Sequence, residues 1–231
     1  MTEVIITGAS GGIGYETARL FAAEHETHVI AVSRNAGRLK KLQEVCTSEF
    51  PGCNIDILPS DITDPGLHKK ITGLCSHTDI LINNAGLLIK KPFDDFTISE
   101  EQQLFGVNFF GAAMLIRSLL PQLAKGTIRH VVNIGSMSGY QGSARFPGLT
   151  MYGAAKAAIA SLSESLAAEY PQIRFNCLAL GAVDTAMLQQ AFPGYKAPVT
   201  TKQIAAFIHH FALHSHQVIN GKTLPVNLST P

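Results

Sequence analysis

The stretch Val4-Ile5-Ile6-Thr7-Gly8-Ala9-Ser10-Gly11-Gly12-Ile13-Gly14 joins a short apolar run to a glycine-rich turn. The apolar run predicts a buried β-strand, and the residues from about 13 to 24 predict a helix that begins inside the turn. Glycines at positions 8, 12 and 14 allow a tight turn and a close approach of the backbone to a ligand. The start of the helix then offers free N–H groups and a partial positive charge to a pyrophosphate. Because tight turns need glycine in any case, it is the position of the turn, between the first strand and the first helix, that favours dinucleotide binding.

The same alternation of apolar runs and helical patterns continues along the chain. Later strands are expected at residues 28–32, 55–58, 80–82, 130–134, 174–179 and 222–226, and later helices near residues 39–45, 67–74, 99–119, 152–169 and 202–213. The strands are apolar on both faces, which is typical of a parallel sheet covered by helices on both sides. We therefore expect residues 1–231 to form a single α/β domain, a doubly wound (Rossmann) seven-stranded parallel sheet with helices on both faces.

Three local details of this prediction depend on single residues or short segments. Ser99 is expected to cap the long helix, with Gln102 at the capping-box position. Pro121 is expected just past the end of that helix. Residues 186–201 contain two prolines and a glycine and are expected to form a surface loop.

The composition indicates a globular protein that binds neither nucleic acid nor a membrane. Of 231 residues, 46% are hydrophobic and 15% are charged, and the formal net charge is +1 without a long basic or acidic run. A charged share below the usual ~25% indicates that some surface is buried against other subunits. No apolar run approaches the length of a membrane span, and the chain starts without a signal peptide, so a soluble cytoplasmic protein is expected.

The cysteines and histidines lack metal-ligand spacing, so no metal is expected. The four cysteines form no C-x-x-C pair, which indicates buried or free thiols in a reducing compartment. His210 and His214 would share one face of the last helix, which leaves a metal site there as an alternative. Solvated histidines at the end of an amphipathic helix are the favoured interpretation.

Tyr152-Gly-Ala-Ala-Lys156 places a phenol and an ammonium four residues apart, on one face of a predicted helix. A free tyrosine titrates near ~10, and a neighbouring lysine charge favours the phenolate and lowers the tyrosine pKa. Together with a bound cofactor, the lysine can make Tyr152 a general acid or base at neutral pH. The pair taken alone also fits a solvated helix face, so its interpretation depends on the rest of the chain.

The second strand is expected to end at Ser33-Arg34, where NAD-binding proteins often carry an acidic residue that holds the ribose 2′-hydroxyl. No acid stands here, and the guanidinium of Arg34, assisted by Arg38, can pair with a 2′-phosphate. This favours NADP(H) over NAD(H) as the cofactor. An ordinary solvated arginine is the alternative.

Several motifs, in order along essentially the whole chain, resemble the short-chain dehydrogenase/reductase family of the compact single-domain type. They are the turn Thr7-Gly8-x-x-x-Gly12-x-Gly14, Asp61-Ile62 after the third strand, Asn83-Asn-Ala-Gly86 after the fourth, Asn108 in the long helix, Ser136 after the fifth strand, the Tyr152-x-x-x-Lys156 pair, and Gly181-Ala-Val-Asp-Thr185 after the sixth strand. The resemblance implies an oxidoreductase acting on a small-molecule carbonyl or alcohol without a metal. It also implies a homodimer or homotetramer that packs through the helices at 99–120 and 152–169.

The resemblance implies catalytic roles for four residues. Tyr152 would protonate the substrate oxygen as hydride reaches the carbon, and Lys156 would hold the nicotinamide ribose and lower the tyrosine pKa. Ser136 would hydrogen-bond the carbonyl oxygen where charge develops. Asn108 would distort its helix and bind a water that links Lys156 to solvent. The simpler alternatives are a turn cap for Ser136, a mid-helix polar residue for Asn108 and a solvated charge for Lys156.

The cofactor-binding residues that the resemblance implies form a longer set. They are Thr7, Gly8, Ser10, Gly11, Gly12, Ile13, Gly14, Ser33, Arg34, Asp61, Ile62, Asn83, Ala85, Gly86, Gly181, Val183 and Thr185, together with Tyr152 and Lys156. Gly11 stands where many NADP-preferring members carry a basic residue, which weakens the preference for NADP(H). Leu180 replaces the proline that usually precedes Gly181, so the turn there is expected to be less rigid.

The substrate pocket is expected to be formed by residues 137–150 and 186–199. Sixteen positions separate Ser136 from Tyr152, more than is common in the family, so the first segment should reshape one pocket wall. The mixed apolar and aromatic residues favour a partly apolar carbonyl compound, while Arg145 can meet an anionic group or face solvent. One alternative is a catalytically silent dinucleotide-binding regulatory protein on the same fold. Another is an epimerase or dehydratase of the extended type, but such proteins carry a substrate domain for which this chain has no room.

Overall fold

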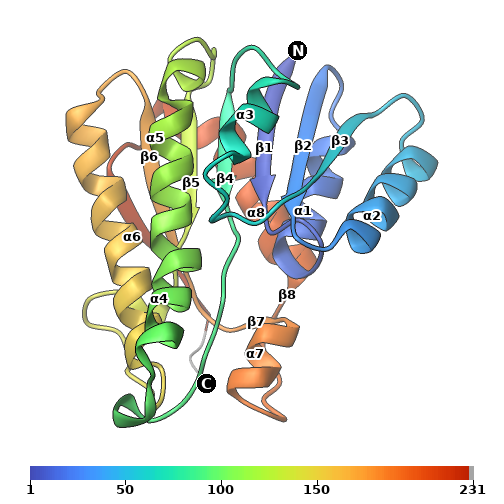
Figure 1. The fold of residues 1–231 in the computed structure, drawn as a ribbon. Coiled ribbons are helices and arrows are strands. Elements are labelled where there is room, and N and C mark those ends of the chain that lie inside the picture. Colours follow the sequence, from blue (N-terminus) through green and yellow to red (C-terminus); the bar gives the residue numbers. More distant parts are fainter. Residues whose placement is uncertain (229–231) are drawn as a thin grey trace.

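The computed structural model describes residues 1–228 and shows a central sheet between two layers of helices (Figure 1). The seven strands lie in the order β3-β2-β1-β4-β5-β6-β9, and all neighbouring pairs are parallel. They are β1 (Thr2–Thr7), β2 (Thr27–Ser33), β3 (Asn54–Pro59), β4 (Ile80–Asn83), β5 (His130–Ile134), β6 (Arg174–Leu180) and β9 (Lys222–Val226). The predicted doubly wound α/β fold is confirmed.

The helices alternate with these strands. They are α1 (Gly12–Ala22), α2 (Ala36–Glu49), α3 (Leu67–Thr72), α4 (Ile98–Phe105), α5 (Gly111–Leu123), α6 (Thr150–Glu169), α7 (Ala186–Ala191) and α8 (Thr201–His214). One π-helical turn, η2 (Gly106–Phe110), joins α4 to α5, and short 3-10 turns lie at η1 (Phe93–Asp95), η3 (Met137–Gly139) and η4 (Ser215–Gln217). A separate two-stranded ladder pairs β7 (Val183–Asp184) with β8 (Val199–Thr200).

The core lies on both faces of the sheet, because successive strand residues point to opposite sides. Ile6 packs in one apolar cluster with side chains of α1, α2 and α8, whereas its neighbour Ile5 packs in a second cluster with side chains of α3 and α5. Both isoleucines are fully buried. Burying a side chain of this size contributes about 1.5–3 kcal/mol, so the run of apolar residues in each strand stabilises both layers at once.

The strand order places a crevice at the carboxyl edge of the sheet. The chain leaves β1 towards β2 and β3 on one side, and returns to β4 on the other side of β1. At such a reversal the connections after neighbouring strands separate, which is where open α/β sheets bind ligands. In Figure 1 this edge faces downward, on the side where α7 lies.

Two predicted helix boundaries are wrong. The helix cap is Thr97, whose Oγ1 accepts a hydrogen bond from the Glu100 N–H (3.3 Å) while the Glu100 carboxylate accepts one from the Thr97 N–H (2.9 Å). Thr97 and Glu100 have the same spacing as Ser99 and Gln102 but lie two residues earlier. The Glu100 carboxylate also forms a salt bridge with Lys91 (2.7 Å). Pro121 lies inside α5 rather than after it. The helix continues to Leu123, which is fully buried.

The expectation of a surface loop at residues 186–201 is also wrong. The segment contains α7, the strand β8 and the start of α8. The Thr185 side chain caps α7 by accepting a hydrogen bond from the Leu188 N–H (3.1 Å), and Thr200 caps α8 with a capping box completed by Gln203. Pro193, Gly194 and Pro198 all lie in residues 192–198, the short connection between α7 and β8 that contains neither helix nor strand.

One segment, Ile98–Leu123, is long and apolar enough to cross a membrane by length and composition, which corrects the expectation that no such run exists. Length and composition are a weak criterion, because a core helix of a globular protein passes the same test. Here Leu115, Leu119 and Leu123 pack in the second apolar cluster of the core.

Candidate active site

A cavity of about 430 Å³ lies at the carboxyl edge of the sheet, between the glycine turn, α6 and α7. All residues predicted to act in catalysis or cofactor binding line it, except Gly14, Asn83 and Asn108. The lining residues are far apart in the chain, from Thr7 to Phe192. They meet because parallel strands end at the same edge of the sheet.

The glycine turn forms a cradle with two tight positions and two open ones. A Cβ at Gly8, whose φ is +71°, would lie 2.8 Å from Asn84 Nδ2, and one at Gly14 would clash with the same side chain and with the Gly8 carbonyl. A Cβ at Gly11 or at Gly12 would make only an ordinary contact, with Arg38 Nη1 (4.0 Å) or with Thr185 Cγ2 (3.8 Å), and no side chain caps the start of α1. The first residues of α1 therefore line the cavity, and their N–H groups have no capping side chain, which fits a pyrophosphate.

Replacing Gly14 by alanine is expected to lower the free energy of unfolding by about 1–3 kcal/mol, because the new methyl group meets the Gly8 backbone. Gly11→Ala is the matched control: its methyl group would have Arg38 Nη1 at 4.0 Å as the nearest atom, so a change within about 0.5 kcal/mol is expected. Urea unfolding of both variants without ligand measures the difference. Equal stability of the two variants would contradict the packing role of Gly14.

Asn83 and Asn84 face opposite sides of the chain at the end of β4. Asn83 is buried behind the cavity, where its Nδ2 donates to Asn133 Oδ1 (2.8 Å) and its Oδ1 has no partner. Asn84 lines the cavity, and its Nδ2 donates to the Thr7 carbonyl (3.0 Å). Sequence reasoning therefore missed Asn84. The alternation of side chains at the end of a strand is the signal that distinguishes the two residues.

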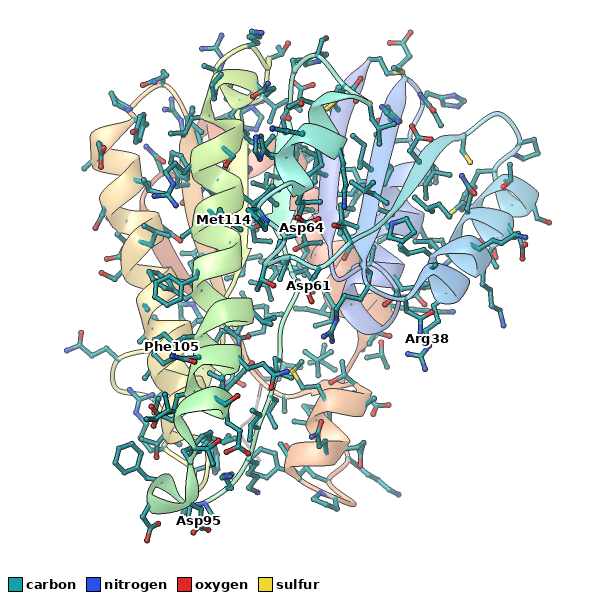
Figure 2. The ribbon with its side chains drawn as sticks, viewed as in Figure 1. Arg38, Asp61, Asp64, Asp95, Phe105 and Met114 are labelled. Atoms are coloured by element: carbon teal, nitrogen blue, oxygen red, sulfur yellow. The ribbon has the colours of Figure 1, made fainter. Side chains whose placement is uncertain are left out.

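Two arginines lie at the end of the cavity that adjoins β2. Arg34 Nη1 lies 3.8 Å from Asp61 Oδ2, and both side chains are exposed. Arg38, labelled with Asp61 in Figure 2, has its Nη1 atom 4.0 Å from the position that a Cβ at Gly11 would occupy. Arg38 thus lies beside the place where a basic residue at position 11 would stand. Ser33 Oγ donates to Ser10 Oγ (2.8 Å), which ties the end of β2 to the glycine turn.

The structure brings Tyr152, Lys156 and Ser136 together at the other end of the cavity. Tyr152 and Lys156 lie on α6 and are 8% and 5% exposed, so they are not on a solvated helix face. Lys156 Nζ donates a hydrogen bond to the Ile134 carbonyl (2.8 Å) and lies 5.9 Å from the centre of the Tyr152 ring. Ser136 comes from the turn after β5, and its side chain also accepts a hydrogen bond from the Ser138 N–H (3.2 Å).

Burial shifts the pKa values of this pair in opposite directions, and each shift disfavours the charged form. Burial raises the pKa of Tyr152 to about 12, and the hydrogen bond with Ser136 acts against this shift. Burial lowers the pKa of Lys156 to about 8. In the protein without a cofactor, the expected lowering of the tyrosine pKa by Lys156 is therefore wrong, because desolvation dominates and the ammonium is directed at the Ile134 carbonyl.

Asn108 lies behind the cavity in the π-helical turn η2, which is the helix distortion expected at this residue. Its Nδ2 donates to the carbonyls of Leu87 (2.7 Å) and Leu104 (2.9 Å), and its Oδ1 accepts from the Leu87 N–H (3.2 Å). A Cβ at Gly86 would lie 3.3 Å from Asn108 Oδ1 and 3.8 Å from Lys156 Nζ. The backbone of Gly86 therefore lies close to both the Asn108 side chain and the Lys156 ammonium.

No group of three or more His, Cys, Asp or Glu side chains that could hold a metal ion occurs in residues 1–228. The rings of His210 and His214 lie 4.6 Å apart, on one helix face as expected. The donors in the cavity are hydroxyl, amide, ammonium, guanidinium and backbone N–H groups. This set is suited to binding anions and carbonyl oxygens.

The fold and the cavity define a dinucleotide-binding α/β protein, and comparisons with known proteins agree with that class. A family model described as short chain dehydrogenase matches residues 2–196. An uncharacterized oxidoreductase from Staphylococcus epidermidis is 27% identical, with 95% of each chain covered. Human retinol dehydrogenase 8 is 31% identical to this chain, and the matched region covers 75% of this chain and 55% of the length of the relative.

Solved structures give the same result. A short chain dehydrogenase from Escherichia coli CFT073, complexed with NADPH, has 28% sequence identity and a TM-score of 0.85, covering 97% of this chain and 95% of its own. The chain belongs to the short-chain dehydrogenase/reductase family, whose members bind nicotinamide dinucleotides. It is accordingly a dehydrogenase or reductase of that family.

Proposed function

We propose that this protein is an NADP(H)-dependent oxidoreductase that transfers hydride between nicotinamide and a small-molecule carbonyl or alcohol, with Tyr152 as general acid or base. The observation that carries the proposal is the burial of Tyr152 and Lys156 in the cavity that also holds Ser136 and the glycine turn. Burying ionisable groups costs free energy, and such groups in a cleft with shifted pKa values are typical of catalytic sites.

When bound, the nicotinamide cofactor supplies or accepts the hydride. The N–H groups at the start of α1 would hold its pyrophosphate, and Arg34 with Arg38 would bind the 2′-phosphate. The other residues proposed to contact the cofactor surround the same cavity or lie directly behind it: Thr7, Gly8, Ser10, Gly14, Ser33, Asp61, Ile62, Asn83, Ala85, Gly86, Gly181, Val183 and Thr185. The crystal structure of a relative with NADPH supports this cofactor preference.

At the substrate, the Tyr152 hydroxyl would donate its proton to the carbonyl oxygen, and Ser136 would donate a hydrogen bond to the same oxygen as negative charge develops. Because the pKa of Tyr152 is raised to about 12, the hydroxyl holds its proton at neutral pH, as carbonyl reduction requires. Lys156 would hold the nicotinamide ribose. Asn108 would hold a water that connects Lys156 to solvent, so that the proton on Tyr152 can be restored.

The test of this function is the loss of NADPH absorbance with a panel of aldehydes, ketones and quinones. We expect turnover with at least one apolar carbonyl compound. The similarity to a protein named retinol dehydrogenase supports the inclusion of long apolar substrates. Tight NADPH binding without turnover of any compound would instead favour a catalytically silent dinucleotide-binding protein.

We also propose a homodimer or homotetramer that packs through α5 and α6. A groove between these helices is lined by Phe109, Phe110, Met114, Leu120, Leu162 and Leu166. The Phe110 side chain is 60% exposed in the single chain. Large apolar side chains gathered in one groove are typical of an interface.

Sedimentation at micromolar concentration is therefore expected to show a dimer or tetramer, and Phe110→Glu is expected to shift it to a monomer, because a carboxylate would be buried unpaired. Phe93→Glu is the matched control, since Phe93 is equally exposed at 61% but lies in η1, away from the groove. A monomeric wild-type protein would contradict the proposal.

We place this enzyme in the cytoplasm, where it would act without a nucleic-acid or membrane partner. The cysteines Cys46, Cys53, Cys75 and Cys177 are all free, and three of them are buried, as suits a reducing compartment. The formal net charge of +1 provides no strong field for a polyanion.

A further inference from the structure

The substrate end of the cavity is covered by a lid, defined here as residues 185–198 between β7 and β8. The pairing of Val183 with Val199 holds its two ends together. Within the lid, α7 is capped by Thr185, and Gln189 donates a hydrogen bond to the Tyr195 carbonyl (2.8 Å). The lid is therefore an ordered element with its own hydrogen bonds, in contrast to the expected loop.

The lid is joined to the opposite wall of the cavity by one cation and two aromatic rings. Lys90 Nζ donates a hydrogen bond to the Ala191 carbonyl (2.5 Å) and lies 4.4 Å from the centre of the Phe192 ring. Phe192 packs edge-on against Phe146, with ring centres 5.2 Å apart. We call these three residues, Lys90, Phe146 and Phe192, the latch.

The wall that carries Lys90 is itself held in place. The Lys91 N–H donates to the Gly148 carbonyl (3.1 Å), and the Lys91 ammonium pairs with Glu100 (2.7 Å). Gly148 has a φ of +82°, and a Cβ there would lie 3.0 Å from Lys90 Cγ. The latch thus connects this wall to the lid, whose residues Met187, Ala191 and Phe192 also pack in the apolar cluster around Tyr152.

The chamber beneath the latch is apolar. The residues that line it beside Tyr152 are Leu88, Phe146, Leu149, Met187, Ala191 and Phe192, which also pack in one apolar cluster with Tyr152. Met187 Cε would lie 3.7 Å from a Cβ at Gly86, so the side chain extends across the chamber.

No free charge faces this chamber among the described residues that line the cavity. Their charged side chains are Arg34, Arg38 and Asp61, at the β2 end, and Lys156, whose ammonium donates to the Ile134 carbonyl and is assigned above to the nicotinamide ribose. Arg145 is not in the lining, because its guanidinium donates to the Ser138 carbonyl. Lys90 is directed at the Ala191 carbonyl and the Phe192 ring. A carboxylate in the chamber would lose its hydration without gaining a cation.

We infer that the latch closes an apolar chamber over Tyr152 that selects uncharged carbonyl compounds with a compact apolar body and rejects anionic ones. This inference rests on the proposed function, since it concerns the substrate of the same site. It assigns Lys90, Phe146 and Phe192, which join the lid to the opposite wall, as specificity-determining residues that do not contact the reacting atoms.

The first experiment compares 4-carboxybenzaldehyde with its methyl ester in the presence of NADPH. The two compounds share the ring and the reacting aldehyde, and they differ in charge. We expect kcat/KM for the acid to be lower by about 30-fold or more, because the chamber leaves a carboxylate unpaired. Equal kcat/KM for the acid and the ester would overturn the inference and leave the proposed function intact.

The second experiment compares Lys90→Met with Lys125→Met. Lys90→Met keeps the aliphatic stem and removes both contacts to the lid, so KM for the ester is expected to rise about 5-fold or more with little change in kcat. Lys125→Met is the control, because Lys125 is exposed and lies outside both the cavity lining and the lid, and its KM should stay at the wild-type value. A selective loss of activity towards the acid in Lys90→Met would show that Lys90 captures anions, and would overturn the inference.

A binding measurement keeps the inference testable if neither aldehyde is turned over. Calorimetry on the NADPH-loaded protein compares methyl 4-(hydroxymethyl)benzoate with 4-(hydroxymethyl)benzoate, the alcohols that correspond to the two aldehydes. Preferential binding of the ester would support the apolar chamber even if the proposed catalysis fails. Equal binding, or no binding of the ester at millimolar concentration, would overturn it.

Discussion

Replacement of Tyr152 by phenylalanine is expected to lower kcat for carbonyl reduction by about 10³-fold, within the range that general acid catalysis contributes. Phenylalanine keeps the ring that packs beside Leu149 and Ala155 in the apolar cluster but has no proton to donate. The fold and the cofactor site should therefore remain. The measurement is the rate of NADPH oxidation at saturating carbonyl substrate, together with NADPH binding followed by fluorescence.

Tyr170→Phe is a suitable control, because Tyr170 follows the same helix but lies outside the catalytic cavity. It should keep both the rate and the NADPH dissociation constant of the wild-type protein. A Tyr152→Phe variant that retains a substantial rate would refute the assignment of Tyr152 as the general acid. Loss of NADPH binding in that variant would show that the Tyr152 hydroxyl serves the cofactor site instead.

Replacement of Arg34 by alanine is expected to raise the dissociation constant for NADPH by about 10–100-fold and that for NADH by much less. The reason is that a hydrogen bond to a charged group contributes about 1.5–3 kcal/mol, and only NADPH carries the 2′-phosphate. The pairing of Arg34 with Asp61 competes little with a phosphate, since it spans 3.8 Å on an exposed surface.

Titration of both cofactors against Arg34→Ala and Arg38→Ala separates the contributions of the two guanidinium groups. Lys40→Ala is the control, because Lys40 lies on α2 but not in the cavity lining, and it removes a nearby positive charge without removing a contact. Equal weakening of NADPH and NADH in Arg34→Ala would refute the NADP(H) assignment. An effect in Lys40→Ala as large as in Arg34→Ala would indicate general charge attraction.

The fold was predictable because its signals are local. A parallel sheet buries both faces of each strand, so Ile5 and Ile6 form one apolar run, and the glycine turn after them marks the first connection. The seven strands of the central sheet follow from such runs. Most of the cavity lining also follows, because motifs at the ends of parallel strands meet at one edge whatever their separation in sequence.

The predictions from sequence were wrong where two similar local patterns compete, or where a contact between distant residues determines the structure. Thr97 and Ser99 have the same capping potential, and Thr97 forms the cap while its partner Glu100 also pairs with Lys91. Asn83 and Asn84 have the same chemistry, and the direction of the chain at the end of β4 decides which one faces the cavity. The pKa of Tyr152 depends on the burial of its side chain and on the direction of the Lys156 ammonium. The four-residue spacing of Tyr152 and Lys156 predicts neither of these.

The sequence by itself determined the class of the fold, the order of its elements and the family motifs that define the cofactor turn and the Tyr152–Lys156 pair. These depend on the periodicity and chemistry of neighbouring residues, which the chain carries in every conformation. Only the tertiary structure decided the lid, the latch and the uncharged chamber. The hydrogen bond from Lys90 to Ala191 joins residues 101 positions apart, and such a contact exists only once the sheet has brought the two segments to the same edge.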